Sequence, residues 1–145
     1  MIDPVLVNRK INLIGKDFDD LAVYGRMSLE EYLGDRINEV VVERYLERII
    51  GRMIDINYHL VTETGQPPPK DYYESFVELG RIGALPPDFA KSIAGAAGLR
   101  NRIVHEYDEV DERKVYEALG EALRDIPRYV EHVHRFMEKR ASKGQ

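Results

Sequence analysis

The segment from Arg100 to Tyr107 gathers, in one short stretch of chain, four residue types that handle phosphate esters. Its histidine, His105, can take up or release a proton near neutral pH. An arginine such as Arg100 can clamp a phosphate through two parallel hydrogen bonds and stabilise charge that grows in a transition state. These residue types would suit chemistry at a phosphate ester.

The spacing within the segment fits a helix. Asn101 and His105 are four residues apart, so on a helix they are neighbours on one face, and the amide could orient the imidazole. Arg100 and Tyr107 are seven apart and lie nearly in line. Helix ends often carry Arg and His because these cations suit the helix dipole. On residue types alone, a structural role is therefore the better interpretation.

The elements that must position this segment are helices. Apolar residues recur at steps of three and four, the pattern of helices buried along one face. These stripes are Val7 to Leu21, Val42 to Leu60, Phe76 to Leu79 and Val115 to Phe136, with a further helix from Pro87 toward His105. No segment alternates with period two over the length of a strand. We expect an all-α, antiparallel, up-and-down bundle of about five helices, in one domain over residues 1–145.

Particular residues mark where these helices begin and end. Ser28 and Asp71 each begin a capping-box pattern, and Asp111 is a good N-cap for the last helix. Gly65 and the three prolines after it should end the long second stripe. Pro127 lies inside the last stripe, and because the apolar rhythm continues past it, we expect that helix to continue as well.

Composition limits the classes of function. The 145 residues include no cysteine, which excludes disulfides, thiol nucleophiles and cysteine-ligated metals. The net charge of −5 argues against a protein that coats nucleic acid broadly, so any RNA contact should be local. The first residues resemble no signal peptide, and no apolar run approaches the roughly 20 residues that span a bilayer. We expect a cytoplasmic protein without a membrane partner.

The motif resembles a known family. Arg100-Asn101, followed by His105, Glu106 and Tyr107, is similar to the arginine, four residues, histidine, any residue, tyrosine motif of HEPN domains of the HepT type. The similarity extends to Asn57 to Leu60 late in a long helix, to Gly65 and the proline-rich turn, and to Tyr73 to Phe76. It covers most of the chain from Asp55 onward.

The resemblance implies a function and a set of roles. HepT-like proteins are homodimeric helical bundles that act as toxins, cutting RNA without a metal or other cofactor in a cleft that the two subunits share. Their partner is a small MntA-like nucleotidyltransferase antitoxin, in a type VII-like pair. Carried over, Arg100 and His105 are the catalytic pair, Asn101 supports them, and Tyr107 is the site where the partner attaches AMP. The alternative is a non-catalytic helical module that binds RNA or a nucleotide and docks a nucleotidyltransferase.

Two further features allow more than one interpretation. His59 and Glu63 are four apart, but two ligands do not make a metal site, and a hydrogen-bonded or cleft-lining histidine is the better interpretation. Ser92 to Gly98 gives the fourth helix a surface of small residues, although an interior glycine costs roughly 1 kcal/mol against alanine. Close packing, within the bundle or against a second copy, would offset that cost; a simply weak helix is the alternative.

Overall fold

The computed structural model describes the backbone of residues 1–105 and 111–143, and the side chains of these residues except 99–105. This part of the chain is helical and contains no strand. Its helices are α1 (Pro4–Gly25), α2 (Leu29–Leu33), α3 (Arg36–Glu63), α4 (Tyr72–Arg81), α5 (Pro87–His105) and α6 (Glu112–Ser142). None of the helices described is both long enough and apolar enough to cross a membrane.

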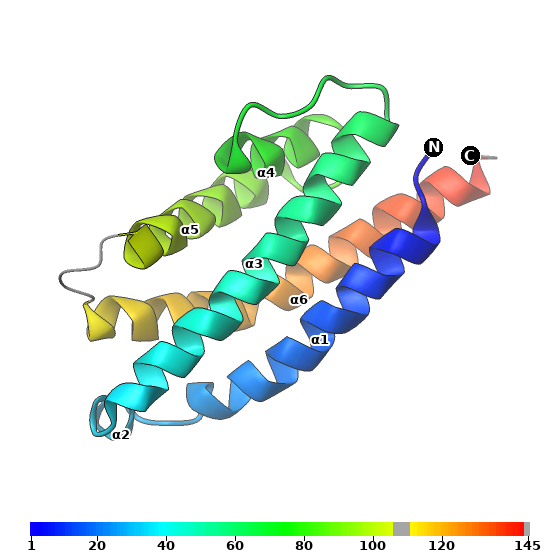
Figure 1. Ribbon diagram of the computed structural model, residues 1–145. Coiled ribbons are helices and arrows are strands. Elements are labelled where there is room, and N and C mark those ends of the chain that lie inside the picture. Colours follow the sequence, from blue (N-terminus) through cyan, green and yellow to red (C-terminus); the bar gives the residue numbers. More distant parts are fainter. Residues whose placement is uncertain (106–110, 144–145) are drawn as a thin grey trace.

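The long helix α3 is the centre of the bundle. It packs against each of the other five helices described. Figure 1 shows α1 running alongside it on one side, α4 and α5 on the other, and α6 passing behind it. The arrangement confirms the predicted all-α bundle, and every apolar residue of the predicted α3 stripe is buried: Val42, Leu46, Ile49, Met53, Ile56 and Leu60.

The short helix α2 accounts for the difference between about five predicted helices and the six described. Its five residues follow Ser28, whose hydroxyl oxygen accepts from the Glu31 amide at 3.1 Å. The Glu31 carboxylate in turn accepts from the Ser28 amide at 3.2 Å. The predicted capping box is therefore present, but it opens a separate turn of helix before Asp35 caps α3.

The other predicted boundaries are confirmed. Gly65 follows the end of α3 with a φ of 89°, in the left-handed region that glycine adopts without strain. Asp71 and Asp111 cap α4 and α6 through side-chain oxygens that accept from backbone amides. Helix α6 continues through Pro127, as the unbroken apolar rhythm indicates.

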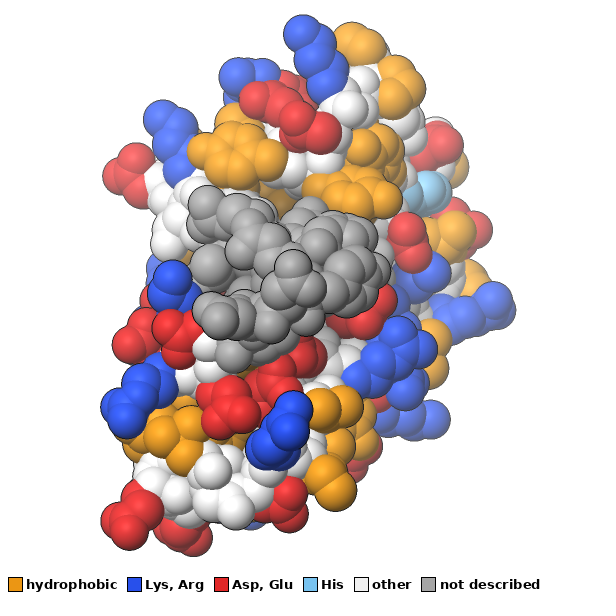
Figure 2. All heavy atoms as spheres, turned by 60° about the vertical axis from the view of Figure 1, so that its left-hand side comes forward, with side chains coloured by type: hydrophobic (Ala, Val, Ile, Leu, Met, Phe, Trp, Pro, Cys, Tyr) orange, Lys and Arg blue, Asp and Glu red, His pale blue; other side chains and the backbone are white. Residues whose placement is uncertain are grey.

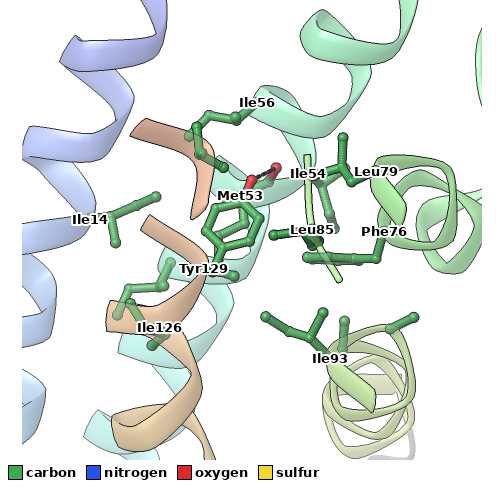
Figure 3. Close-up of a cluster of buried hydrophobic side chains, with 14 of the residues drawn as sticks. Ile14, Met53, Ile54, Ile56, Phe76, Leu79, Leu85, Ile93, Ile126 and Tyr129 are labelled. Carbon is green, nitrogen blue, oxygen red and sulfur yellow. Dashed lines mark hydrogen bonds between the residues drawn. The ribbon is translucent and has the colours of Figure 1, made fainter. Parts of the chain in front are cut away.

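A buried polar network ties the core together. The Tyr129 hydroxyl of α6 donates to Asn57 Oδ1 of α3 at 2.6 Å and lies 3.1 Å from the Met53 carbonyl. The Asn57 amide donates to the hydroxyl of Ser75 on α4 at 3.2 Å. All three polar side chains are fully buried, and Figure 3 shows Tyr129 among the aliphatic residues of the core. The network therefore joins α3, α4 and α6 at one level of the bundle.

Tyr129→Phe should destabilise the fold by about 1–3 kcal/mol, because the buried Asn57 Oδ1 loses its donor while the packing volume is kept. Urea denaturation measures the change as a lower midpoint with an unaltered slope. Tyr73→Phe is the matched control, since Tyr73 is exposed. A Tyr129 variant as stable as this control would show that the network contributes nothing to the free energy of unfolding.

Candidate functional site

Three of the four motif residues lie on the last turns of α5. The helix extends to His105, so Arg100 and Asn101 are within it, and Asn101 is one turn before His105. This confirms the helical backbone that the spacing requires. The side chains of these three residues, and Tyr107 altogether, lie outside the described residues. The Asn101–His105 contact and the position of Tyr107 therefore stay predictions.

The first half of α5 is packed firmly against the core, and this packing fixes the direction in which the helix continues. Ile93, Ala94 and Ala97 are buried against the core. A Cβ at Gly80 of α4 would lie 3.2 Å from Pro87 Cα and 3.1 Å from Ala90 Cβ. Glycine at this position allows α4 and the start of α5 to approach closely. The motif thus follows directly after a well-packed stretch of the same helix.

The end of α5 and the start of α6 lie at the same end of the bundle (Figure 1). Tyr32 of α2 is buried near Glu112, the first residue of α6, and near Glu39 of α3. Its ring packs on Tyr116 with centroids 5.1 Å apart, and its hydroxyl has no hydrogen-bond partner among the residues that the structure describes. Burial, and then the negative charges of the nearby glutamates, raise the pKa of Tyr32, so the phenol stays protonated.

Two carboxyl groups of α3 share this end of the bundle. Loss of solvent, a hydrogen bond with Glu39 and the charges of Glu39 and Glu47 raise the pKa of Glu43 to about 8. The Glu39–Glu43 pair therefore holds a proton at neutral pH. Figure 2, which brings this side of the molecule forward, shows several acidic side chains gathered on it.

His59 and Glu63 have structural partners. The backbone amide of Asp3 donates to His59 Nε2 at 2.9 Å, and Glu63 pairs with the N-terminal ammonium group. The hydrogen bond to that ammonium, and then its charge, lower the pKa of Glu63. The hydrogen-bonded interpretation of His59 is thus confirmed. Across the residues searched, all within the described part, no three His, Asp or Glu side chains are placed to hold a metal ion.

Sequence reasoning missed one feature, a basic groove between α1 and α3. Its lining includes Arg44, Arg48 and Arg52, with Lys10 of α1 opposite them. The pattern was visible in the sequence, because arginines four residues apart share one face of a helix. Asp17, the partner of Arg48 and Arg52, could not be identified beforehand, because it is a carboxylate that lies buried at a position of the apolar stripe of α1.

Comparisons with known proteins bear on the chain as a whole. A family model described as "Ribonuclease HepT-like" matches residues 14–133. A curated relative, the tRNA nuclease HepT of Aphanizomenon flos-aquae (strain 2012/KM1/D3), is 37% identical over 136 residues, which are 94% of this chain and 92% of the relative. The family model therefore begins within α1 and ends within α6, and it includes all of α2 to α5.

Two solved structures share the fold. One is a tri-AMPylated Shewanella oneidensis HEPN toxin in complex with an MNT antitoxin, with a TM-score of 0.80, 23% identity, and coverage of 90% of this chain and 97% of that one. The other is a toxin–antitoxin with AMP-PNP, with a TM-score of 0.77, 19% identity, and coverage of 88% and 97%. The likeness confirms the helical architecture.

The proton on the Glu39–Glu43 pair predicts a pH dependence of stability. Between about pH 4.5 and 8 the folded chain binds a proton that the unfolded chain has released, so this pair's contribution to stability falls as pH rises. Glu43→Gln should flatten the fall, because a neutral amide replaces the protonated carboxyl. Thermal melts at pH 5 and pH 8 measure it, with the exposed Glu121→Gln as control. Equal slopes in the two variants would contradict the shared proton.

Proposed function

Because the chain belongs to the ribonuclease HepT-like family, we propose that it is a metal-independent endoribonuclease toxin, paired with an MntA-like nucleotidyltransferase antitoxin. The observation that carries the proposal is the 37% identity, over nearly the whole chain, to a relative named as a tRNA nuclease. That name makes tRNA the first substrate to test. Both structural neighbours are toxin–antitoxin structures, and this supports the choice of partner.

The proposed reaction uses the ribose 2′-oxygen as the nucleophile. A base takes the proton of the 2′-hydroxyl, and the oxygen attacks the adjacent phosphorus. The bond from phosphorus to the 5′-oxygen breaks, and an acid gives that oxygen a proton. The products are a 2′,3′-cyclic phosphate and a 5′-hydroxyl. His105 supplies the proton transfers, Arg100 stabilises the charge on the phosphate, and Asn101 orients the imidazole.

A shared site between two subunits follows from the count of proton-transfer groups. The motif of one chain offers one histidine, whereas the reaction needs a base and an acid. A two-fold dimer brings two copies of His105 to one cleft. The surface of α5 supports an approach of a second copy: apart from the adjacent residues and the nearby backbone of α5 itself, no described heavy atom lies within 4 Å of a Cβ built on Gly95 or Gly98.

The tyrosine of the motif is the site at which the toxin is controlled in this proposal. We propose that the antitoxin transfers AMP from a nucleoside triphosphate to the Tyr107 hydroxyl, with pyrophosphate as the leaving group. The attached phosphodiester places bulk and negative charge beside the cleft. An RNA backbone, itself anionic, is then repelled from the catalytic pair.

His105→Ala should abolish RNA cleavage and leave the melting temperature unchanged, because the substitution removes only the proton-transfer group. Cleavage of tRNA is followed on denaturing gels, and the 2′,3′-cyclic phosphate ends are identified by their resistance to direct ligation. His134→Ala, on the exposed face of α6, is the control. Cleavage that survives in the His105 variant, or that a strictly monomeric protein carries out, would remove the shared-site mechanism.

Addition of EDTA should leave the rate of cleavage unchanged, because the proposed proton transfers need no Lewis acid.

The second candidate function is a module that binds RNA without cutting it. A wild-type protein that binds RNA with no cleavage under any condition would favour this binding module. The net charge of −5 is the observation on the side of that second candidate.

Tyr107→Phe should remain toxic in the presence of the antitoxin, because it lacks the hydroxyl that accepts AMP. Intact-mass spectrometry after incubation with the nucleotidyltransferase and ATP should detect AMP adducts on the wild type and none on the variant. Tyr73→Phe, an exposed tyrosine on α4, controls for non-specific transfer. An adduct of equal mass on the Tyr107 variant would place the modification elsewhere.

A further inference from the structure

A second surface of this chain suits a nucleic acid, away from the end of α5. It is the groove between α1, α3 and the start of α4, with a volume of about 740 Å³. Four cationic residues, two tyrosines and a glycine contribute to its lining: Lys10, Arg44, Arg48, Arg52, Tyr58, Tyr72 and Gly51. Most of these residues come from one helix, α3, which is the central element of the bundle.

The floor of the groove is open helix backbone. Positions 44, 48, 51, 55 and 58 of α3 form one stripe along the helix, and Gly51 is at its middle. Apart from the adjacent residues and the nearby backbone of α3 itself, no described heavy atom lies within 4 Å of a Cβ built on Gly51. Nothing in the described chain therefore requires glycine there, although glycine is unfavourable inside a helix. Its absent side chain leaves room for a ligand to lie against the backbone.

One buried carboxylate holds two of the guanidinium groups in place. Asp17 of α1 is 5% exposed and pairs with Arg48 Nε at 3.1 Å and with Arg52 Nη1. The same nitrogen of Arg52 lies 3.4 Å from the Leu13 carbonyl. A guanidinium carries five N–H donors, and these contacts engage only part of them. Two arginines are thus pre-oriented along the wall of the groove.

The charge balance of the groove differs from that of the chain. The four cationic side chains of the groove meet three carboxylates, those of Asp17, Glu47 and Asp55. This leaves a surplus of one positive charge in a chain of net charge −5. Each carboxylate already has a cation: Asp55 lies 2.9 Å from Lys10, and Glu47 lies 3.4 Å from Arg44. An incoming phosphate therefore meets no unpaired carboxylate among these three. A local site of this kind is what a net-acidic RNA-binding protein needs.

Two tyrosines close the α4 end of the groove. Tyr72 is 53% exposed, and Tyr58 lies beside it on α3. Partial burial, followed by the charges of Tyr72 and Asp71, raises the pKa of Tyr58. An exposed aromatic ring next to arginines is a platform on which a nucleobase can stack.

We propose that this groove holds a strand of the RNA substrate, with phosphates on Arg44 and Arg48, a base against Tyr72, and the backbone passing over Gly51. The inference rests on the proposed function for the identity of the ligand. The surplus of positive charge favours an anionic ligand. Ile54, the one aliphatic side chain in the described lining, is 6% exposed, so the groove offers little aliphatic surface to a protein partner.

The test measures binding separately from cleavage. A fluorescent single-stranded oligonucleotide with 2′-O-methyl riboses lacks the nucleophile and cannot be cut, and its anisotropy reports affinity for the full-length protein. The double variant R44A/R48A should bind about tenfold more weakly, and the slope of log affinity against log salt should fall by about 1.4, as expected for two lost contacts to a single strand. R135A is the control, because Arg135 pairs with Glu131 on α6, outside the groove.

A second pair of variants separates binding from folding. Gly51→Leu fills the floor of the groove and should bind at least about fivefold more weakly while melting no lower than wild type. Tyr72→Ala should weaken binding by a similar factor, because the ring on which the base stacks is removed. Unchanged affinity and salt slope in R44A/R48A, or an equal loss in R135A, would overturn the inference. Absence of cleavage with intact, groove-dependent binding would refute the nuclease proposal alone.

Discussion

The hydrogen bonds of Asn57 are the constraint on which the arrangement of the helices depends. A buried amide needs partners for both its donor and its acceptor, and here one partner is on α4 and the other on α6. Apolar packing alone would tolerate a slip of one helix along another. The Tyr129 hydroxyl, which also reaches the Met53 carbonyl, fixes the register of α6 on α3. The levels at which α4 and α6 meet α3 are set by the same few atoms.

Through this register α3 organises the rest of the molecule. One of its faces carries the core, another carries the arginines of the groove, and its first half carries the carboxyl pair at the end of the bundle. Helix α5 is attached to this framework by its first half, where Gly80 lets α4 approach closely. The candidate motif is thus held by a helix whose position depends on residues far from the motif in the sequence.

Much of the fold could be predicted because the apolar periodicity is regular and the capping residues are clear. The bounds of α3, α4 and α6 follow from Gly65, Asp71 and Asp111, each of which has a local physical reason. The separate α2 was missed because a capping box indicates where a helix starts and says nothing of its length. The motif was found by its residue types and spacing, and the backbone of α5 agrees with that spacing as far as His105.

Contacts between residues far apart in the chain could not be predicted from the sequence. Asp17 occupies an apolar-stripe position, and only the fold reveals that Arg48 and Arg52 converge on it. The proton on Glu43 likewise depends on its burial beside Glu39, which charge counting misses. The partner of His59 is a backbone amide near the start of the chain, more than fifty residues away. Each of these features arises from tertiary packing.

The attachment of α5 through residues that precede the motif has an evolutionary consequence. Ala97 is the last of that helix's described side chains to be buried, and the motif begins three residues after it. The described contacts that attach α5 to the bundle are therefore made by residues other than those of the motif. A lineage that exchanged a motif residue would keep these contacts, and such copies can persist in genomes and later acquire a different task.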